Sequence, residues 1–427
     1  MTHPHRWQFE TSAVRAGYSP DTTTSAVVPP IYQTVGYAFK DTGHAARLFN
    51  LDEPGNIYTR IMNPTTDILE QRVAELEGGA AAVAFSSGMS AITAAVLNLC
   101  RAGDELNAST SLYGGTWTLF SSTLQDFGIT VHFVSDTELP HAHELVNDCT
   151  RGVFVESIGN PRLNITNIRA WADFAHQHDI PLLVDNTFAT PYLEQPVVHG
   201  ADVVIHSLTK WMGGHGTSLG GIIVDSGQFN YNTPKFPQFS QPGSSYHGLV
   251  FGEHEAAYAL RLRVKILRNT GAAIAPFNAF LILLGLETLA VRMKEACWSA
   301  ALLAERLSHH SKVSWVNYPG LEDDRAHPLA KEYLRHGLFG TMLNFGVRGG
   351  RQQAEQMMDC LGLWLMVANV GDARSMAIHP ASTTHQQLNP QEQELAGAGG
   401  DVIRLSVGLE NVEDLWADLD QALLYFG

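Results

Sequence analysis

The sequence predicts an α/β fold: a mainly parallel central sheet, a smaller C-terminal α/β domain and an extended N-terminal arm. Between residues 61 and 290, short runs that are apolar throughout alternate with segments of helical periodicity. Strands without polar alternation are typical of sheets covered by helices on both faces. The length of 427 residues also exceeds what one hydrophobic core usually supports, so we expect at least two domains.

The first 60 residues are rich in Thr, Pro, Gly and polar residues and show weak periodicity. We interpret residues 1–60 as an arm that contacts a neighbouring subunit, with a loosely ordered tail as the alternative. The first helix of the next domain is predicted to begin at Asn63-Pro64, because an N-cap followed by proline starts many helices. Gly78-Gly79 is expected to end it.

The remaining elements follow from short apolar runs and helical spacing. Helices are expected at 91–99, around Ile168 to Ala175, and at 412–424. Strands are expected at 81–85, 129–134, 152–156, 181–185, 203–206, 221–224 and 402–408. Residues 228–250 have no periodicity, which predicts a long loop that forms a lid or a channel wall. We assign residues 61–290 to the first domain and 291–427 to the C-terminal domain.

Composition excludes several classes of protein. The chain is 45% hydrophobic and 16% charged, which is typical of an ordered globular enzyme. Its net charge of −16 argues against nucleic acid or an anionic membrane as a partner. The four cysteines are far apart, which favours a reducing cytoplasm. The N-terminus lacks the apolar run of a signal peptide, and no window approaches a membrane span.

Polar residues at strand ends are the candidate functional residues, because open α/β sheets bind ligands beyond the carboxyl ends of their strands. Ser87-Gly88-Met89 forms a strand-to-helix turn, where free N–H groups and the helix dipole favour a phosphate. A simple tight turn is the alternative. Glu156, at the end of another strand, is followed by Asn160-Pro161, and Asn160 either forms a structural turn or points its amide at a ligand oxygen.

Two charged residues follow buried strands. Asp185 needs a cationic partner there, and a protonated pyridine nitrogen would be one; a helix cap or a salt bridge is the alternative. Lys210, in Ser207-Leu208-Thr209-Lys210, is also at the end of a buried strand. Burying its charged amine there costs free energy unless the amine is paired or covalently modified. A surface lysine on a turn is its alternative.

Together these residues form the set that pyridoxal phosphate requires: a phosphate cradle, an aspartate for the ring nitrogen and a lysine for the imine. The lysine amine can then act as a base.

The chain resembles the pyridoxal phosphate enzymes of cysteine and methionine metabolism over almost its whole length. The resemblance rests on seven motifs in order: 58–65 (YTRIMNPT), 86–89 (SSGM), 112–116 (LYGGT), 156–161 (ESIGNP), 185–187 (DNT), 207–210 (SLTK) and 404–408 (RLSVG). It implies fold type I of these enzymes and a homotetramer built from two tight dimers.

The resemblance also implies roles by position. The lysine would form the imine and move protons between Cα and Cγ, and the aspartate would pair with the ring nitrogen. A tyrosine would stack on the ring and assist proton transfer or the departure of the leaving group. These are Lys210, Asp185 and Tyr113. The phosphate would be held by Ser87, Gly88, Met89, Ser207 and Thr209, and by Tyr58 and Arg60 of a neighbouring subunit. The substrate carboxylate would be bound by Arg404 with Asn160 and Asn369, because a guanidinium can grip a carboxylate with two hydrogen bonds.

Three segments resemble the O-acetylhomoserine sulfhydrylases within that family: 210–217 (KWMGGHGT), 369–375 (NVGDARS) and 379–387 (HPASTTHQQ). Residues 228–250 are absent from shorter γ-lyases, and Gly115 stands where methionine γ-lyases carry a cysteine. The resemblance therefore implies a transferase of methionine biosynthesis that makes homocysteine and acetate from O-acetyl-L-homoserine and sulfide, or methionine from methanethiol. Methionine γ-lyase, cystathionine γ-synthase and O-succinylhomoserine sulfhydrylase are the alternatives.

Two further classes of site are not favoured. His215, His379 and His385 are scattered and lack acidic partners in the sequence, so we expect no metal site. A dinucleotide-binding dehydrogenase would need a GxGxxG turn after an early strand, and the sequence has none.

Overall fold

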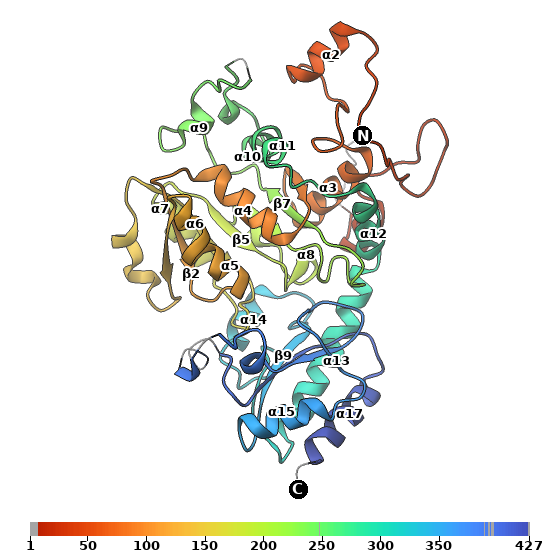
Figure 1. Ribbon diagram of the computed structural model, residues 1–427, viewed down its shortest axis with the longest axis vertical. Coiled ribbons are helices and arrows are strands. Elements are labelled where there is room, and N and C mark those ends of the chain that lie inside the picture. The colour runs from red at the N-terminus through yellow and green to blue at the C-terminus, as the bar shows by residue number, and fades with distance from the viewer. Residues whose placement is uncertain (1–6, 247, 388, 392, 394–396, 426–427) are drawn as a thin grey trace.

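The computed structural model describes residues 7–246, 248–387, 389–391, 393 and 397–425. The N-terminal arm lies at the top of Figure 1, the large sheet below it, and the C-terminal part at the bottom. The helices are α1 (Phe9–Arg15), α2 (Thr42–Phe49), α3 (Pro64–Glu77), α4 (Gly88–Leu99), α5 (Gly114–Thr118), α6 (Leu124–Asp126), α7 (Ile168–Gln177), α8 (Thr190–Leu193), α9 (Pro237–Ser240), α10 (Ala257–Arg261), α11 (Arg268–Thr270), α12 (Pro276–Glu287), α13 (Leu289–Ser308), α14 (His327–Tyr333), α15 (Arg351–Asp359) and α17 (Val412–Leu424).

The large sheet has seven strands in the order β1-β7-β6-β5-β4-β2-β3. Their bounds are β1 (Ala81–Phe85), β2 (Glu105–Ser109), β3 (Thr130–Val134), β4 (Thr150–Glu156), β5 (Leu182–Asp185), β6 (Val203–His206) and β7 (Gly221–Asp225). Neighbouring strands are parallel except for β7, which is antiparallel to both β1 and β6. The mainly parallel sheet predicted from the apolar runs is therefore confirmed, with one reversed strand.

Local sequence signals set several helix ends. The Asn63 side chain accepts hydrogen bonds from the N–H groups of Thr65 and Thr66, and Gly78 ends α3 at φ 77°, in the left-handed region that favours glycine. Helix α17 has the predicted bounds. Helix α4 begins at Gly88, three residues before the prediction, because Ser87 and Ser90 form a capping box that starts the helix earlier.

The described residues 228–246 and 248–250 form a long irregular segment in which α9 is the one short helix. Three of its aromatic side chains, Tyr231, Phe236 and Phe239, are buried. Tyr231 stacks on Phe239 with ring centroids 4.8 Å apart, and both pack near Tyr258 of α10. Buried aromatic contacts of this kind fasten a segment to the body of a protein. The predicted long loop is present and is fastened by its aromatic anchor; its role as a lid or a channel wall stays a prediction.

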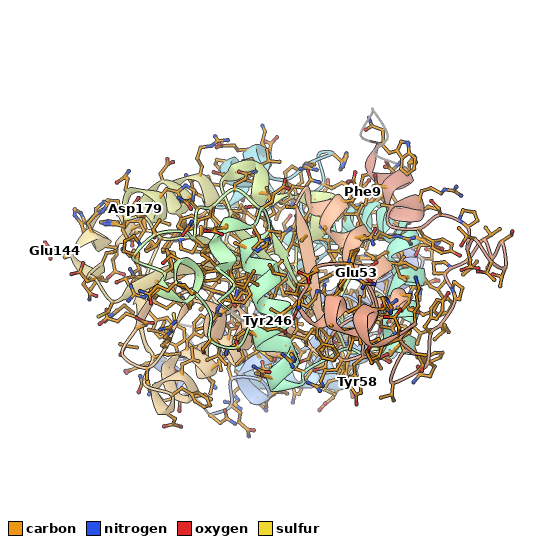
Figure 2. All side chains as sticks on the ribbon, turned by 90° about the horizontal axis from the view of Figure 1, so that it is seen from above. Phe9, Glu53, Tyr58, Glu144, Asp179 and Tyr246 are labelled. Atoms are coloured by element: carbon orange, nitrogen blue, oxygen red, sulfur yellow. The ribbon has the colours of Figure 1, made fainter. Side chains whose placement is uncertain are left out.

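The arm carries an unusual share of exposed apolar side chains. They include Val27, Val28, Ile31, Val35, Phe39 and Phe49. Tyr58, at the end of the arm, lies at the lower edge of the molecule in Figure 2, whereas Glu144 lies at its left end. Exposed apolar groups gathered on one segment are typical of a surface that a partner covers.

The C-terminal part contains a second sheet in the order β10-β11-β12-β9-β8. Its strands are β8 (Val313–Asn317), β9 (Met342–Val347), β10 (Leu365–Met366), β11 (Met376–Ile378) and β12 (Val402–Ser406). Helix α13 contributes Met293 to the core of the large sheet and Leu303 to the core of the small one. Among the described residues, no single helix is long and apolar enough to span a membrane. Taken together, α12 and α13 would be, by length and composition alone, but the pair is bent by 60°.

Candidate active site

Lys210 lies in the turn after β6, partly buried, and its amine reaches toward the C-terminal part of the chain. Its Nζ donates a hydrogen bond to Oδ1 of Asn369 at 2.6 Å. Burial lowers the pKa of Lys210, and the positive charge of Arg404 lowers it further. The structure thus brings Lys210, Asn369 and Arg404 together from distant parts of the sequence.

Asp185 is the last residue of β5, and 9% of it is exposed. Its Oδ1 accepts hydrogen bonds from the N–H of Thr187 at 3.0 Å and from the Thr187 hydroxyl at 2.5 Å. In the described part of the chain, no hydrogen bond or Lys or Arg ion pair engages its Oδ2. Burial raises the pKa of Asp185, while the bonds from Thr187 lower it. A cation beside Oδ2 would therefore stabilise the ionised carboxylate.

The start of α4 lies against the end of β6. A Cβ atom added to Gly88 would lie 2.7 Å from Cβ of Ser207, which is closer than carbon atoms normally approach. Glycine is therefore required for this close packing. The Ser87 side chain caps the N–H of Ser90 at 3.1 Å, and no hydrogen bond among the described residues uses the N–H groups of Gly88 and Met89. Free N–H groups at a helix start are suited to a phosphate.

Ser207 and Thr209 flank this cradle. The Ser207 N–H donates to the Thr187 hydroxyl at 2.8 Å, which links the ends of β5 and β6. The Thr209 hydroxyl accepts a hydrogen bond from the N–H of Gly220 at 3.1 Å and donates one to its carbonyl. The backbone of Gly220 thus fixes the Thr209 side chain, and a contact between Thr209 and a phosphate stays a prediction.

Arg404 comes from the middle of β12, and only 7% of it is exposed. Its Nη1 donates to Oδ1 of Asn160 at 3.0 Å, and no described carboxylate forms an ion pair with it. Burial lowers the pKa of Arg404 to about 10, so the guanidinium remains charged at neutral pH. A buried cation without an anionic partner is costly, which indicates that the site receives a carboxylate ligand.

Tyr113 stands at the start of α5 and is 50% exposed. Its ring lies over Gly115, where an added Cβ would be 2.5 Å from Cε1 of the tyrosine. Its backbone N–H donates to Oε1 of Glu156 at 2.6 Å.

Sequence reasoning assigned no role to Glu156 or Thr187. Both lie at or just after a strand end, the same signal that marked Asp185. Their contacts with Tyr113 and Asp185 became apparent only in the fold.

Tyr58 and Arg60 lie apart from this group within the chain. The Arg60 guanidinium lies 5.3 Å from the ring centroid of Tyr58 and donates to the carbonyl of Arg268. Among the described residues, neither side chain has a hydrogen bond to the residues around Lys210. Their predicted role in a neighbouring subunit stays a prediction.

The described residues include no group of three or more His, Cys, Asp or Glu side chains arranged for a metal ion. His215 contacts the Gly213 carbonyl through Nδ1, and His379 contacts the Ser382 hydroxyl. His385 is partly buried, and burial followed by the charge of Arg404 lowers its pKa.

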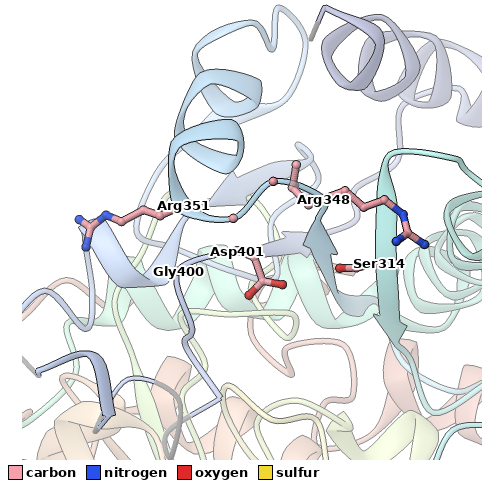
Figure 3. A pocket seen from close by; sticks show the side chains of 8 residues that line it. Ser314, Arg348, Arg351, Gly400 and Asp401 are labelled. Carbon is pink, nitrogen blue, oxygen red and sulfur yellow. The ribbon is translucent and has the colours of Figure 1, made fainter. Parts of the chain in front are cut away.

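An open hollow of about 500 Å³ lies elsewhere, beside the small sheet, and is lined by Ser314, Val347, Arg348, Gly349, Gly350, Arg351, Gly400 and Asp401. Figure 3 shows the guanidinium groups of Arg348 and Arg351 directed away from this hollow, with the carboxylate of Asp401 inside it. The hollow contains none of the residues that surround Lys210.

These positions fit pyridoxal phosphate. The start of α4 provides unpaired N–H groups against Ser207, where an added Cβ would fill the space between the two segments. Asp185 provides a buried carboxylate oxygen for a ring cation, and Lys210 provides an amine with a lowered pKa.

The comparisons with known proteins agree with this fit. Residues 10–424 match the family model described as Cys/Met metabolism PLP-dependent enzyme. The chain is 51% identical to O-acetyl-L-homoserine sulfhydrylase of Leptospira meyeri, covering 98% of this chain and 97% of the relative. It is 48% identical to homocysteine synthase of Schizosaccharomyces pombe, covering 97% and 98%.

Two solved structures share the fold over the whole chain. A candidate O-acetylhomoserine (thiol)-lyase from Campylobacter jejuni has a TM-score of 0.95 and 40% identity, covering 98% of this chain and 100% of that one. It carries N'-pyridoxyl-lysine-5'-monophosphate at its own position 205. The metB protein of Corynebacterium glutamicum has a TM-score of 0.85 and 32% identity, covering 100% of each chain. The protein therefore belongs to the pyridoxal phosphate-dependent enzymes of cysteine and methionine metabolism, with pyridoxal phosphate as its cofactor.

Proposed function

We propose that this enzyme is a transferase that makes L-homocysteine and acetate from O-acetyl-L-homoserine and sulfide. The observation that carries the proposal is similarity over nearly the full chain to proteins that share this activity by name. They include O-acetyl-L-homoserine sulfhydrylases of Leptospira meyeri (51%), Thermus thermophilus (47%) and Corynebacterium glutamicum (42%), and the homocysteine synthase of Schizosaccharomyces pombe (48%).

The cofactor, when bound, supplies an electron sink that lets bonds at the substrate α and γ carbons break. Asp185 would hold the ring nitrogen, and the start of α4 would hold the phosphate, because Thr187 engages only Oδ1 of Asp185 and the first N–H groups of α4 have no partner among the described residues. Tyr113 covers the ring.

Arg404 and Asn160 bind the substrate carboxylate. Their own hydrogen bond at 3.0 Å fixes the guanidinium before the substrate arrives, so less ordering is required on binding.

Lys210 moves protons at the substrate carbons. Its amine accepts a proton only when it is neutral, and both burial and the charge of Arg404 favour the neutral amine. Asn369 Oδ1 holds Nζ at 2.6 Å, which fixes the position of the amine. The amine therefore removes the Cα proton. A Cβ proton is then lost as acetate leaves from Cγ, and protons return to Cβ and Cα after sulfide has added at Cγ.

We further propose a homotetramer in which Tyr58 and Arg60 complete the neighbouring subunit's phosphate site. The exposed apolar side chains of the arm support this assembly. A reducing, cytoplasmic environment is supported by the four cysteines, all of which are free. The division into residues 1–60, 61–290 and 291–427 is supported by the second hydrophobic core, which begins within α13.

The test is an assay of the purified holoenzyme with O-acetylhomoserine, O-succinylhomoserine or methionine, each with and without sulfide. We expect homocysteine from the acetyl ester, and only with sulfide. Rapid release of 2-oxobutanoate from methionine alone would refute the proposal. Lys210→Ala should abolish homocysteine formation, and Lys331→Ala, at an exposed lysine of α14, is the control.

The role of the arm is tested by mixing two inactive variants, Lys210→Ala and Arg60→Ala, and letting their subunits reassort. If the arm completes the partner's site, each mixed pair contains one site with no substitution, so about a quarter of the wild-type activity should return. No recovery in mixed oligomers would show that Arg60 acts within its own subunit.

A further inference from the structure

Glu156 lies beside Asp185 at the ends of the strands and has no role in the mechanism above. It is the last residue of β4, is 5% exposed, and is in register with Asp185 on the neighbouring strand β5. Neighbouring residues in register on parallel strands project to the same face of a sheet. Two buried carboxyl groups therefore lie side by side where these strands end.

The Glu156 carboxyl holds two loops of the site. Its Oε1 accepts the hydrogen bond from the Tyr113 N–H at 2.6 Å, and the backbone N–H of Asn160 also faces the carboxyl. Tyr113 is the predicted ring-stacking residue, and Asn160 holds Arg404 at 3.0 Å. One side chain thus joins the loop that covers the ring to the loop that orients the carboxylate-binding arginine.

The charge of the pair is decided by burial. Burial raises the pKa of Glu156 well above its usual range, and the neighbouring Asp185 raises it further, while the two backbone N–H groups act in the opposite direction. Ionising both of two adjacent buried carboxyl groups has a high free-energy cost, because the two negative charges repel each other away from water. Asp185 must be ionised to hold a ring cation, so Glu156 is the neutral member.

We propose that Glu156 is a positioning residue. As a neutral acid it holds the backbone N–H groups of Tyr113 and Asn160 in place, and it leaves the negative charge of the pair on Asp185. The inference rests on the site proposed above but not on the identity of the leaving group or of the sulfur nucleophile.

The test compares Glu156→Gln with Glu156→Ala in the holoenzyme. Glutamine keeps a neutral side chain with an acceptor oxygen at the same reach, so cofactor retention on gel filtration and the visible absorbance of the bound cofactor should match the wild type. Alanine removes the acceptor of buried N–H groups, so the apparent dissociation constant for L-norleucine, an amino acid without a leaving group, should rise roughly 10- to 100-fold. The cofactor should also be lost faster.

Asp225 offers a matched control. It is also a buried carboxyl whose pKa is raised by burial, and it accepts backbone N–H groups from Gly227 at 2.9 Å and Ala259 at 3.0 Å. Because β7 runs antiparallel to β6, Asp225 lies level with Val203 at the start of β6, whereas Glu156 lies at the end of β4. The two carboxyl groups are therefore at opposite ends of the strands. Asp225→Asn and Asp225→Ala should lower the melting temperature without changing norleucine binding or the cofactor spectrum.

Two results would overturn the proposal. In one, Glu156→Gln is as impaired as Glu156→Ala, which would mean that an ionised Glu156 is needed. In the other, Glu156→Ala loses only thermal stability, as the Asp225 variants should. If Glu156→Ala does not fold, Glu156→Asp replaces it: the shorter side chain withdraws the acceptor and should weaken norleucine binding, and unchanged binding would refute the role. Because these measurements need no turnover, they are separate from a failure of the sulfhydrylase assay.

Discussion

Gly88→Ala should weaken the binding of pyridoxal phosphate by separating α4 from the end of β6. The new Cβ would lie 2.7 Å from Cβ of Ser207 and 3.0 Å from its Cα, so rotating the serine side chain cannot relieve the contact. Ordinary carbon contacts begin near 3.5 Å, so the two segments must part by about 0.8 Å. Overpacking of this kind costs about 1–3 kcal/mol.

The apoprotein can relax by opening the cradle, but the bound phosphate requires it closed. Most of this cost should therefore appear as weaker binding, roughly 5- to 150-fold at about 1.4 kcal/mol per tenfold. Equilibrium dialysis with absorbance detection measures the affinity, and melting of the apoprotein measures the strain that remains without the cofactor.

Gly114→Ala is the matched control. Gly114 is also the first residue of a helix, and an added Cβ there meets nothing within 4 Å. Its affinity for the cofactor should equal that of the wild type. Wild-type affinity in Gly88→Ala would refute the reasoning, because it would show that the cradle does not depend on this close packing.

Three further predictions concern the residues around Lys210. Arg404→Gln should raise the KM for the amino acid substrate roughly 100-fold with a smaller effect on kcat, because a carboxylate loses its charged partner; steady-state kinetics that show the loss mainly in kcat would contradict this role. Burial and Arg404 lower the pKa of Lys210, so the neutral amine persists to lower pH than in an ordinary lysine. The rate at which apoprotein recombines with pyridoxal phosphate, followed by stopped-flow absorbance, should thus have its midpoint below the ordinary lysine pKa of about 10.4, and Arg404→Gln should move it upward; a midpoint that stays in place would argue against the coupling. Gly115→Ala would place a Cβ 2.5 Å from Cε1 of Tyr113, so the ring must move, and the circular dichroism of the bound cofactor should change; an unchanged signal would mean that Tyr113 does not cover the ring.

Elements with strong local signals were predictable from the sequence. The helix from Pro64 has an N-cap before it and a left-handed glycine after it, and the helix from Val412 has Asn411 as its cap. Such signals act through neighbouring residues only, so they need no knowledge of the fold. The candidate residues at the ends of β5 and β6 were predictable for a related reason, because charged groups after buried strands require a partner.

The remaining features depend on contacts between distant segments. An apolar run such as Gly221–Asp225 predicts a buried strand but not the direction in which the strand runs in the sheet. Its antiparallel pairing with two neighbours therefore could not be predicted. Strand β2 was missed because Glu105–Ser109 contains polar residues, although Asn107 is fully buried between neighbouring strands. The pairing of Glu156 with Asp185 likewise follows from strand order, which local patterns do not contain.

Arg404, the proposed carboxylate-binding residue, and Asn369, which accepts the hydrogen bond of Lys210, both come from the chain after α13. Lys210, Asp185 and the proposed phosphate-binding residues come from before it. A gene rearrangement that exchanged the segment after α13 with that of a relative would replace Arg404 and Asn369 together and leave the cofactor pocket in place. The two residues would thus be inherited as one block, while Asn160, which hydrogen-bonds Arg404 from before α13, would stay with the cofactor pocket. The join at α13 is constrained, because this helix packs into both cores and must keep its contacts with each.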